Sequence, residues 1–265
     1  MGDATPPVSF VIPTRNHAPF IRQCLDSCLG QSIAGAEILV IDGASTDGTV
    51  AILESYGERV RFISEPDRGQ SDAVNKGIAL ARGEIIAWLN SDDYYADSRV
   101  LGDVLAAFAA DGRLDVVHGD GLLVDVSGIP IRRAAGSQLD GGRRLLVHHS
   151  LVMQPSVFFR RALFVEVGGL DEQLHWAMDY DLWLRMLPAA RGVRYLPRLM
   201  ACTRAHRDAK TFAHMLDQIR EVRALKRRHR DAFGAGFGDR LAMGVGDVAL
   251  YLYWAAVRLG LRKAA

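Results

Sequence analysis

The chain has 265 residues, of which 49% are hydrophobic and 24% are charged, and its formal net charge is +1. This composition is ordinary for a globular protein with a large core, and the charge balance argues against nucleic acid or another strongly charged partner. Three cysteines, with Cys24 and Cys28 one helical turn apart in an apolar segment, indicate reduced thiols in a cytoplasmic protein. The polar start at 1–7 does not resemble a signal peptide, so secretion is not expected.

The first part of the chain alternates strands with helices. Apolar and β-branched runs predict strands at 8–12, 36–41, 60–64 and 84–89, and helical spacing of apolar residues predicts helices at 20–29, 49–55 and 69–80. Ser71 is expected to cap the third helix. This order predicts right-handed crossovers and a mostly parallel twisted sheet with helices on both faces, the α/β class.

The alternation breaks in the second half of the chain. A helix is expected at 100–110 and a strand at 114–118, followed by a hairpin of 122–126 with 129–132, a loop or flap at 134–142, helices at 162–167 and 179–187, and a final strand at 193–202. From there to the end the pattern is helical. The sequence therefore predicts a catalytic domain at 1–207 and a C-terminal helical extension at 208–265.

Acidic residues follow two of the buried strands. Asp42 ends the second strand, and Asp92 with Asp93 follows the fourth. Two adjacent carboxylates repel each other unless a cation or a ligand's hydrogen-bond donors lie between them. Because parallel strands end at one edge of a sheet, the three acids predict a single ligand pocket there.

Four motifs in order resemble family 2 glycosyltransferases of the type A, Rossmann-like nucleotide-sugar-binding fold, from residue 8 to about residue 206. They read VSFVIPTRN, VIDGASTDGT, EPDRGQSDAVNKGIALARGEIIAWLNSDD and GGLDEQLHWAMDYDLWLR. The resemblance implies an inverting, metal-dependent enzyme that moves a sugar from a UDP- or GDP-linked donor to a hydroxyl. It also implies a saccharide or lipid-linked acceptor in envelope or exopolysaccharide synthesis.

The nucleotide side of the site is expected at the first two strand ends. Asp42 accepts hydrogen bonds only, which suits a donor on a base edge, and the matching family residue contacts the base. Pro13, Thr14 and Asn16 would frame the ring. Two cations suit the diphosphate oxygens, Arg68 and Lys76, although Lys76 equally suits a solvated helix position.

The metal is expected at the motif Asn90-Ser91-Asp92-Asp93, whose first position is an acid in many family members and is Asn90 here. The resemblance assigns Mn²⁺ or Mg²⁺ to Asp93 and a ribose-side or second metal role to Asp92, with Asn90 and Ser91 near the nucleotide. His206 is expected to reach the metal or the diphosphate, with Lys210 as a second phosphate partner.

Asp179 is the predicted general base. Asp181 competes with it, but a position two residues further along a helix suits a pair with Arg185 better. The family usually has Glu before the base, where this chain has Met178. The resemblance places the sugar or acceptor pocket at His148, His149, Gln154, Pro155 and Ser156, and Trp176 is expected either to stack on an acceptor sugar or to pack in the core.

The C-terminal region combines a basic segment, 220–230, with a mostly apolar one, 241–261. Asp247 and Arg258 would fall on one stripe of the second segment, which favours an amphipathic helix over a membrane span. Two readings stay open. One is contact with the anionic inner face of the cell membrane, near a lipid-linked acceptor; the other is docking on the catalytic domain or on a partner subunit of a homo-oligomer.

Other classes fit less well. A nicotinamide dehydrogenase needs G-x-G-x-x-G after the first strand, where this chain has PTRNHAP, and a nucleotidyltransferase needs a glycine-rich loop at the same place. Asn90 and Met178 keep open a catalytically degenerate sugar-nucleotide-binding or membrane scaffold protein. The four acids at positions 42, 92, 93 and 179 argue for the enzyme.

Overall fold

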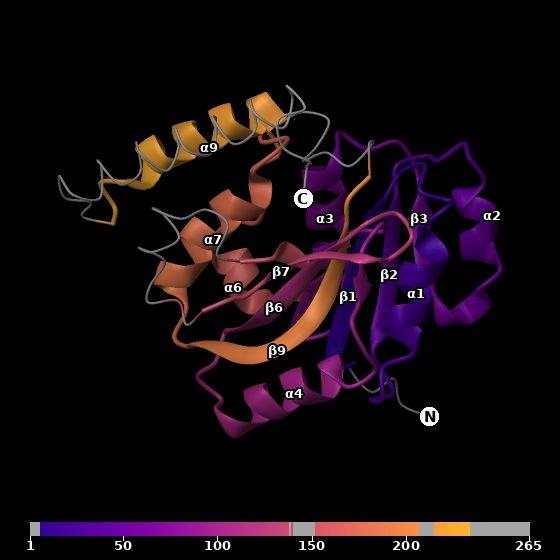
Figure 1. Cartoon of the computed structure of the whole chain (residues 1–265), viewed down its shortest axis with the longest axis horizontal. Helices are drawn as coiled ribbons and strands as arrows, with labels where there is room; N and C mark the ends of the chain where they lie inside the picture. The colour runs from indigo at the N-terminus through magenta and orange to yellow at the C-terminus, as the bar shows by residue number, and fades with distance from the viewer. Residues whose placement is uncertain (1–5, 138, 140–151, 207–214, 234–265) are drawn as a thin grey trace.

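The computed structural model describes residues 6–137, 139, 152–206 and 215–233 (Figure 1). The strands are β1 Val8–Thr14, β2 Glu37–Asp42, β3 Arg61–Ser64, β4 Ile85–Trp88, β5 Tyr94–Tyr95, β6 Val116–Val124, β7 Pro130–Ala134, β8 Val157–Arg160 and β9 Val193–Arg204. The helices are α1 Ile21–Leu29, α2 Thr49–Glu54, α3 Gln70–Leu80, α4 Val100–Ala110, α6 Arg161–Glu166, α7 Met178–Ala189 and α9 Met215–His229, with short 3-10 turns η1 Gly57–Arg59 and η2 Gln154–Ser156.

One nine-stranded sheet forms the centre of the structure, in the order β3-β2-β1-β4-β8-β6-β9-β5, with β7 paired to β6. The strands β3, β2, β1 and β4 are parallel, as the early strand-helix alternation predicts. Beyond them the sheet is mixed, because β8 runs antiparallel to both β4 and β6, while β9 is parallel to β6. The α/β class with helices on both faces is confirmed.

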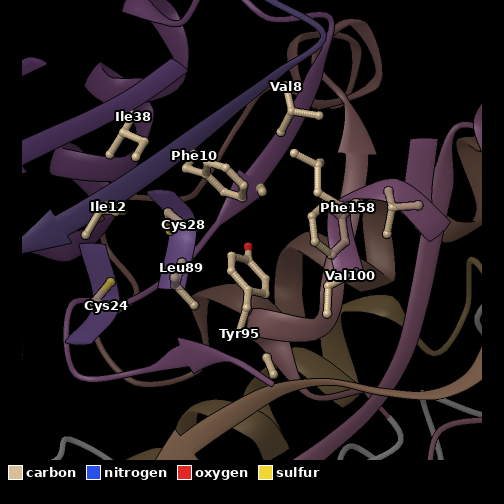
Figure 2. Close-up of a cluster of buried hydrophobic side chains, with 14 of the residues drawn as sticks. Val8, Phe10, Ile12, Cys24, Cys28, Ile38, Leu89, Tyr95, Val100 and Phe158 are labelled. Atoms are coloured by element: carbon tan, nitrogen blue, oxygen red, sulfur yellow. The ribbon is translucent and has the colours of Figure 1, made fainter. Parts of the chain in front are cut away.

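Side chains alternate between the two faces of the sheet, and each face has its own core. Phe10, Ala87 and Phe158 pack with α1 and α4 on one face, where Figure 2 shows Phe10 and Phe158 with Val100 of α4 and Cys24 and Cys28 of α1. The neighbouring positions Val11, Ile86 and Phe159 pack with α3, α6 and α7 on the other face. This alternation explains why the central strands β1, β4 and β8 are mostly apolar.

The expected end of a strand at residue 118 is wrong, because β6 continues to Val124. Gly119 and Gly121 lie within the strand, where a side chain has no room: a Cβ would lie 2.8 Å from Met200 and 2.6 Å from Met153, respectively. The register with β9 shifts here, so the two glycines accommodate an irregularity in one long strand.

The strand β1 extends past Pro13, where it was expected to end. Val11 accepts a hydrogen bond from the amide of Leu89, the residue after β4, and Thr14 accepts one from the amide of Gly43, the residue after β2, so successive residues face alternate neighbours. Pro13 therefore faces the β4 side, and β4 has already ended at Trp88. Its missing N–H costs no ladder hydrogen bond.

The expected cap of α3 by Ser71 is wrong. No side chain caps this helix at Gly69, and the Ser71 hydroxyl donates instead to the carbonyl of Leu174 at 3.2 Å. The partner of the hydroxyl lies about a hundred residues away in the chain, and sequence rules for helix N-caps consider only neighbouring residues.

Helix α9 packs along α7 (Figure 1). Val222 and Leu225 of α9 belong to the same core as α7, and Ile219 is also buried. The boundary expected at 207/208, residues 138 and 140–142 of the expected loop, and the segment 241–261 lie outside the described residues. No helix in the described part of the chain is long and apolar enough to cross a membrane.

Candidate active site

The carboxyl ends of β1, β2 and β3 place Thr14, Asp42 and Ser64 in register. Asp42 is fully buried, and its carboxylate accepts hydrogen bonds from the Ser64 hydroxyl at 2.6 Å, from the Ser45 amide at 2.9 Å and from the Ser45 hydroxyl. Asn16 has a positive φ of 55° and joins the same loop, since its amide donates to the Ser45 hydroxyl and its side-chain oxygen accepts from Thr46 N. Asp42 thus organises the edge expected to bind the base.

The hydroxyl of Thr14 differs from its neighbours. It is buried and has no hydrogen-bond partner in the part of the chain that the structure describes. Because a buried hydroxyl without a partner is uncommon, this atom is available for a ligand at the strand edge.

Asn90 is held by three side chains. Its oxygen accepts from Gln70 at 2.7 Å and from the Trp88 indole at 3.1 Å, and its amide donates to Gln154 at 3.1 Å. Gln154 in turn donates to the carbonyl of Trp88 at 2.6 Å. The amide of Asn90 therefore uses both donor and acceptor, which a carboxylate in its place could not do.

Asp92 and His206 face each other, with Nε2 of His206 2.9 Å from Oδ2 of Asp92. The side chain of His206 is only 5% exposed, and its other nitrogen, Nδ1, is buried with no partner in the described part of the chain. Burial opposes ionisation of Asp92, but the hydrogen bond from His206 and the charge of His17 outweigh it and lower the pKa of Asp92. His17 lies beside this pair, with Nδ1 2.6 Å from the Ser91 hydroxyl.

Asp93 lies in a different environment from its neighbour. It is 2% exposed and accepts a hydrogen bond from the backbone amide of Arg204 at 3.0 Å. Burial and the neighbouring Asp92 carboxylate raise the pKa of Asp93 well above that of an ordinary aspartate. Asp93 therefore connects the loop after β4 with the end of β9, the strand that leads to His206.

Asp92 and His206 are the side chains here that suit a divalent ion. No group of three or more His, Cys, Asp or Glu side chains gathers into a metal cluster among the described residues. A carboxylate oxygen and an imidazole nitrogen aimed at each other nevertheless match the ligand types of Mn²⁺, and phosphate oxygens and water commonly complete such a shell. The residues present fit a metal that binds together with a diphosphate.

Asp179 is in the first turn of α7. Its carboxylate accepts from the amide of Tyr180 at 2.8 Å, and burial raises the pKa of Asp179. Asp181 is buried and pairs with Arg185 at 2.8 Å, as expected, and also with His229 of α9 at 2.9 Å. The second acid is therefore structural, and Asp179 is free of any cationic partner among the described residues.

The first turn of α3 connects the two halves of the site. Gln70 contacts Asn90, and the next residue, Ser71, donates to the carbonyl of Leu174, in the segment that leads through the half-buried Trp176 to α7. Asp179 makes no direct hydrogen bond to Asp92 or His206 in the described residues. The loop after β4 and the start of α7 nevertheless meet at the same end of α3.

Arg68 and Lys76 contact carboxylates in this structure. Arg68 is exposed and pairs with Asp72 at 2.9 Å and Glu172 at 2.7 Å, while Lys76 pairs with Glu65. A pocket of about 380 Å³ beside them is lined by Ile41, Glu65, Pro66, Asp67, Asp72, Asn75, Lys76, Ala79 and Glu172. Its acids outnumber its one lysine, so it does not suit a diphosphate, and the phosphate roles of Arg68 and Lys76 remain predictions.

The residues expected to line the sugar or acceptor pocket are only partly within the described structure. Pro155 and Ser156 are buried in η2, and the Ser156 hydroxyl donates to the carbonyl of Asp120 at 3.1 Å. His148, His149 and Lys210 lie outside the described residues. Two residues were missed: His17, whose place directly after the first strand-end loop was an available signal, and Glu221 of α9, which no motif marks.

Known proteins match the chain in sequence and in fold. Residues 9–168 match the family described as Glycosyl transferase family 2. The chain is 30% identical to an uncharacterized glycosyltransferase of Rickettsia typhi over 227 residues, covering 83% of this chain and 70% of that protein. It is 32% identical to the PGL/p-HBAD biosynthesis glycosyltransferase of Mycobacterium tuberculosis over 186 residues, covering 69% and 70%.

Two solved structures share the fold at low identity. TarS 1–349 from S. aureus in complex with UDP-GlcNAc has a TM-score of 0.66 at 20% identity and covers 82% of this chain, which spans 66% of that one. The mannosyltransferase PcManGT from Pyrobaculum calidifontis in complex with GDP-Man and Mn²⁺ has a TM-score of 0.63 at 17% identity, covering 97% and 81%.

The sheet, its strand-edge acids and these similarities define a glycosyltransferase of the type A fold. The sequence match covers more than half of the chain. The chain belongs to glycosyl transferase family 2.

Proposed function

We propose that this chain transfers a sugar from a nucleotide-diphosphate sugar to an acceptor hydroxyl with inversion at the anomeric carbon, assisted by a divalent cation. The observation that carries the proposal is the 2.9 Å contact between Asp92 and His206. These side chains come from the loop after β4 and the residues just beyond β9, so a carboxylate and an imidazole from distant parts of the chain meet at the strand edge.

Asp92 and His206 would hold Mn²⁺ or Mg²⁺. This reverses the order expected from the motif, which assigned the ion first to Asp93, because Asp93 is 2% exposed and already bonded to the Arg204 amide. A divalent ion bound at this pair supplies Lewis-acid stabilisation of the charge on the departing diphosphate. Asp93 and Arg204 keep the pair in place.

The donor's base would lie against Pro13, Thr14 and Asn16, with Asp42 beneath them. The orphan hydroxyl of Thr14 supports this placement, and the two serines bonded to Asp42 fix the shape of the edge. We propose a UDP- or GDP-linked donor, since the structure of TarS contains UDP-GlcNAc and that of PcManGT contains GDP-Man.

Asp179 would take the proton from the acceptor hydroxyl. A carboxylate whose pKa is raised by burial is a stronger base than one in water, which suits general-base catalysis. One base and one in-line displacement are sufficient for inversion. The half-buried Trp176 and the buried Gln154, Pro155 and Ser156 are proposed to line the sugar or acceptor side.

A saccharide or lipid-linked acceptor in envelope or exopolysaccharide synthesis, used at the inner face of the cell membrane, completes the proposal. The M. tuberculosis relative, named for PGL/p-HBAD biosynthesis, supports a role of this kind.

The test is hydrolysis of a panel of UDP- and GDP-sugars with and without Mn²⁺, using the full chain. Asp92→Asn and Asp179→Asn are compared with Glu58→Gln, an exposed acid on η1. The proposal predicts Mn²⁺-dependent turnover of one donor that both site variants abolish and Glu58→Gln retains. Metal-independent turnover, or full activity in Asp92→Asn, would contradict the metal role. The absence of both turnover and Mn²⁺-dependent nucleotide binding would favour a degenerate binding protein.

A further inference from the structure

Helix α7, which carries Asp179, has no cap of its own. Its N-cap residue Ala177 has no side chain that can accept a hydrogen bond, and no side-chain cap is present within the helix start. The amides that precede a helix need acceptors when they are buried. Here the acceptor comes from α9, a helix 44 residues further along the chain.

Glu221 of α9 accepts hydrogen bonds from three consecutive backbone amides. Its Oε1 accepts from His175 N at 3.0 Å, and its Oε2 accepts from Trp176 N at 2.8 Å and Ala177 N at 2.9 Å. The same segment is bonded to α9 once more, since Gln218 Nε2 lies 3.5 Å from the carbonyl of Trp176. A carboxylate at this end also interacts favourably with the helix dipole.

The opposite side of the segment is fixed by α3. Asn75 bonds Leu170 in both directions, donating to its carbonyl at 3.0 Å and accepting from its amide at 2.9 Å, and Ser71 donates to Leu174. The segment from Leu170 to Ala177 is therefore held at one end by α3 and at the other by Glu221. Asp179 follows two residues later.

Helix α9 is itself firmly docked. Val222 and Leu225 are buried in the α7 core, and His229 bonds the buried Asp181 at 2.9 Å. The carboxylate of Glu221 is thus carried on a fixed helix between two anchored positions. Such an arrangement can set the position of a neighbouring backbone to within a fraction of an ångström.

We propose that Glu221 is a positioning residue for the general base, holding the amides of residues 175–177 so that Asp179 points at the acceptor hydroxyl. The inference rests on the proposed function, because it takes Asp179 as the base. It assigns a role in the reaction to α9, through the position of the segment that leads to Asp179.

The test uses the full chain and the donor selected by the hydrolysis panel. Glu221→Gln keeps the size of the side chain but replaces one carboxylate oxygen by a group that cannot accept, and Glu221→Ala removes both oxygens. Asp217→Asn is the matched control, because this α9 acid pairs with Arg220 on the same helix. His229→Ala weakens the docking of α9 without touching the cap.

Three quantities are measured for each variant: kcat, the Kd of the donor by calorimetry, and hydrogen exchange of the amides at 175–177. The Tm is recorded beside them, so that losses of activity are compared at known thermal stability. Both Glu221 variants should speed this exchange and lower kcat about tenfold or more, with the donor Kd within about twofold of the parent. Asp217→Asn should leave all three unchanged. His229→Ala should lower kcat less than Glu221→Ala at an equal loss of thermal stability.

Several results would overturn the inference. Unchanged exchange would show that Glu221 does not hold the amides, and faster exchange with unchanged kcat would show that the cap is only structural. An equal loss in His229→Ala would trace the effect to helix docking in general. Full turnover in Asp179→Asn would show that Asp179 is not the general base and would contradict the proposed function. That outcome is distinguishable from a failure of the cap, because hydrogen exchange at 175–177 reports on Glu221 independently of turnover.

Discussion

Arg204→Met should destabilise the protein, because the Arg204 side chain connects four elements around the Asp92 loop. The guanidinium donates to the carbonyl of Asp92 at 3.1 Å, to the carbonyl of Val126 at 2.8 Å and to Oε1 of Gln23 at 2.6 Å. It also lies over two rings, Phe20 at 5.2 Å and Tyr94 at 5.3 Å. The residue is only 4% exposed.

The expected loss follows from these contacts. Hydrogen bonds from a charged group contribute about 1.5–3 kcal/mol each, and each cation–π contact about 0.5–1 kcal/mol or more. Water recovers part of the loss, because Val126 and Gln23 are exposed residues, and removal of a buried cation gives back some desolvation energy. We expect a net loss of about 2–4 kcal/mol, which corresponds to a fall in Tm on the order of 10 °C for a chain of this size.

Urea unfolding followed by tryptophan fluorescence measures this change. Arg22→Met is the control, since Arg22 is exposed on α1, and it should change the free energy of unfolding by no more than about 0.5 kcal/mol. A loss below about 0.5 kcal/mol in Arg204→Met would refute the reasoning, because the guanidinium would then not support the loop.

Three further predictions concern single groups. Because burial raises the pKa of Asp179, kcat should fall as the pH drops through a value above the ordinary aspartate pKa of about 4, and an acid limb at or below 4 in the pH–rate profile would contradict the base role. Burial alone would raise the pKa of Asp181, but His229 and Arg185 outweigh it and lower that pKa. The parent should therefore be more stable than Asp181→Asn at pH 7, with the gap narrowing below about pH 4; a gap independent of pH would argue against the pairs. Gly83→Ala should cost about 1–3 kcal/mol in chemical unfolding, since its Cβ would lie 2.6 Å from Ser9 N, whereas Gly112→Ala meets nothing within 4 Å, and equal effects would show that the strand relaxes.

Much of the fold follows from local pattern. The four parallel strands were predicted to within one or two residues. Three of them, β1, β2 and β4, are buried along their whole length, whereas β3 is a partly exposed edge strand. The strand β6 was split in the prediction into 114–118 and 122–126, since Gly119 and Gly121 interrupt the apolar pattern and their contacts with Met200 and Met153 cannot be read from the sequence. Long-range packing decided this element.

The site was only partly predictable for the same reason. The motif located Asp92 and Asp93, but their different roles depend on the Arg204 amide and the His206 ring, both more than a hundred residues away. Ser71 is a residue type that often caps helices, but its hydroxyl donates to the carbonyl of Leu174 instead. Glu221 carries no sequence signal, because an acid on an amphipathic helix is ordinary until the partner amides are known.

The central claim is that Asp92 and His206 hold the cation against a nucleoside diphosphate. A crystal structure of the chain with Mn²⁺ and UDP or GDP tests it most directly, since the anomalous signal of manganese locates the ion. We predict Mn²⁺ bound by a carboxylate oxygen of Asp92 and by Nε2 of His206, at about 2.0–2.3 Å, together with oxygens of the diphosphate. A nucleotide bound at this edge with no metal, or with Mn²⁺ held elsewhere, would contradict the account.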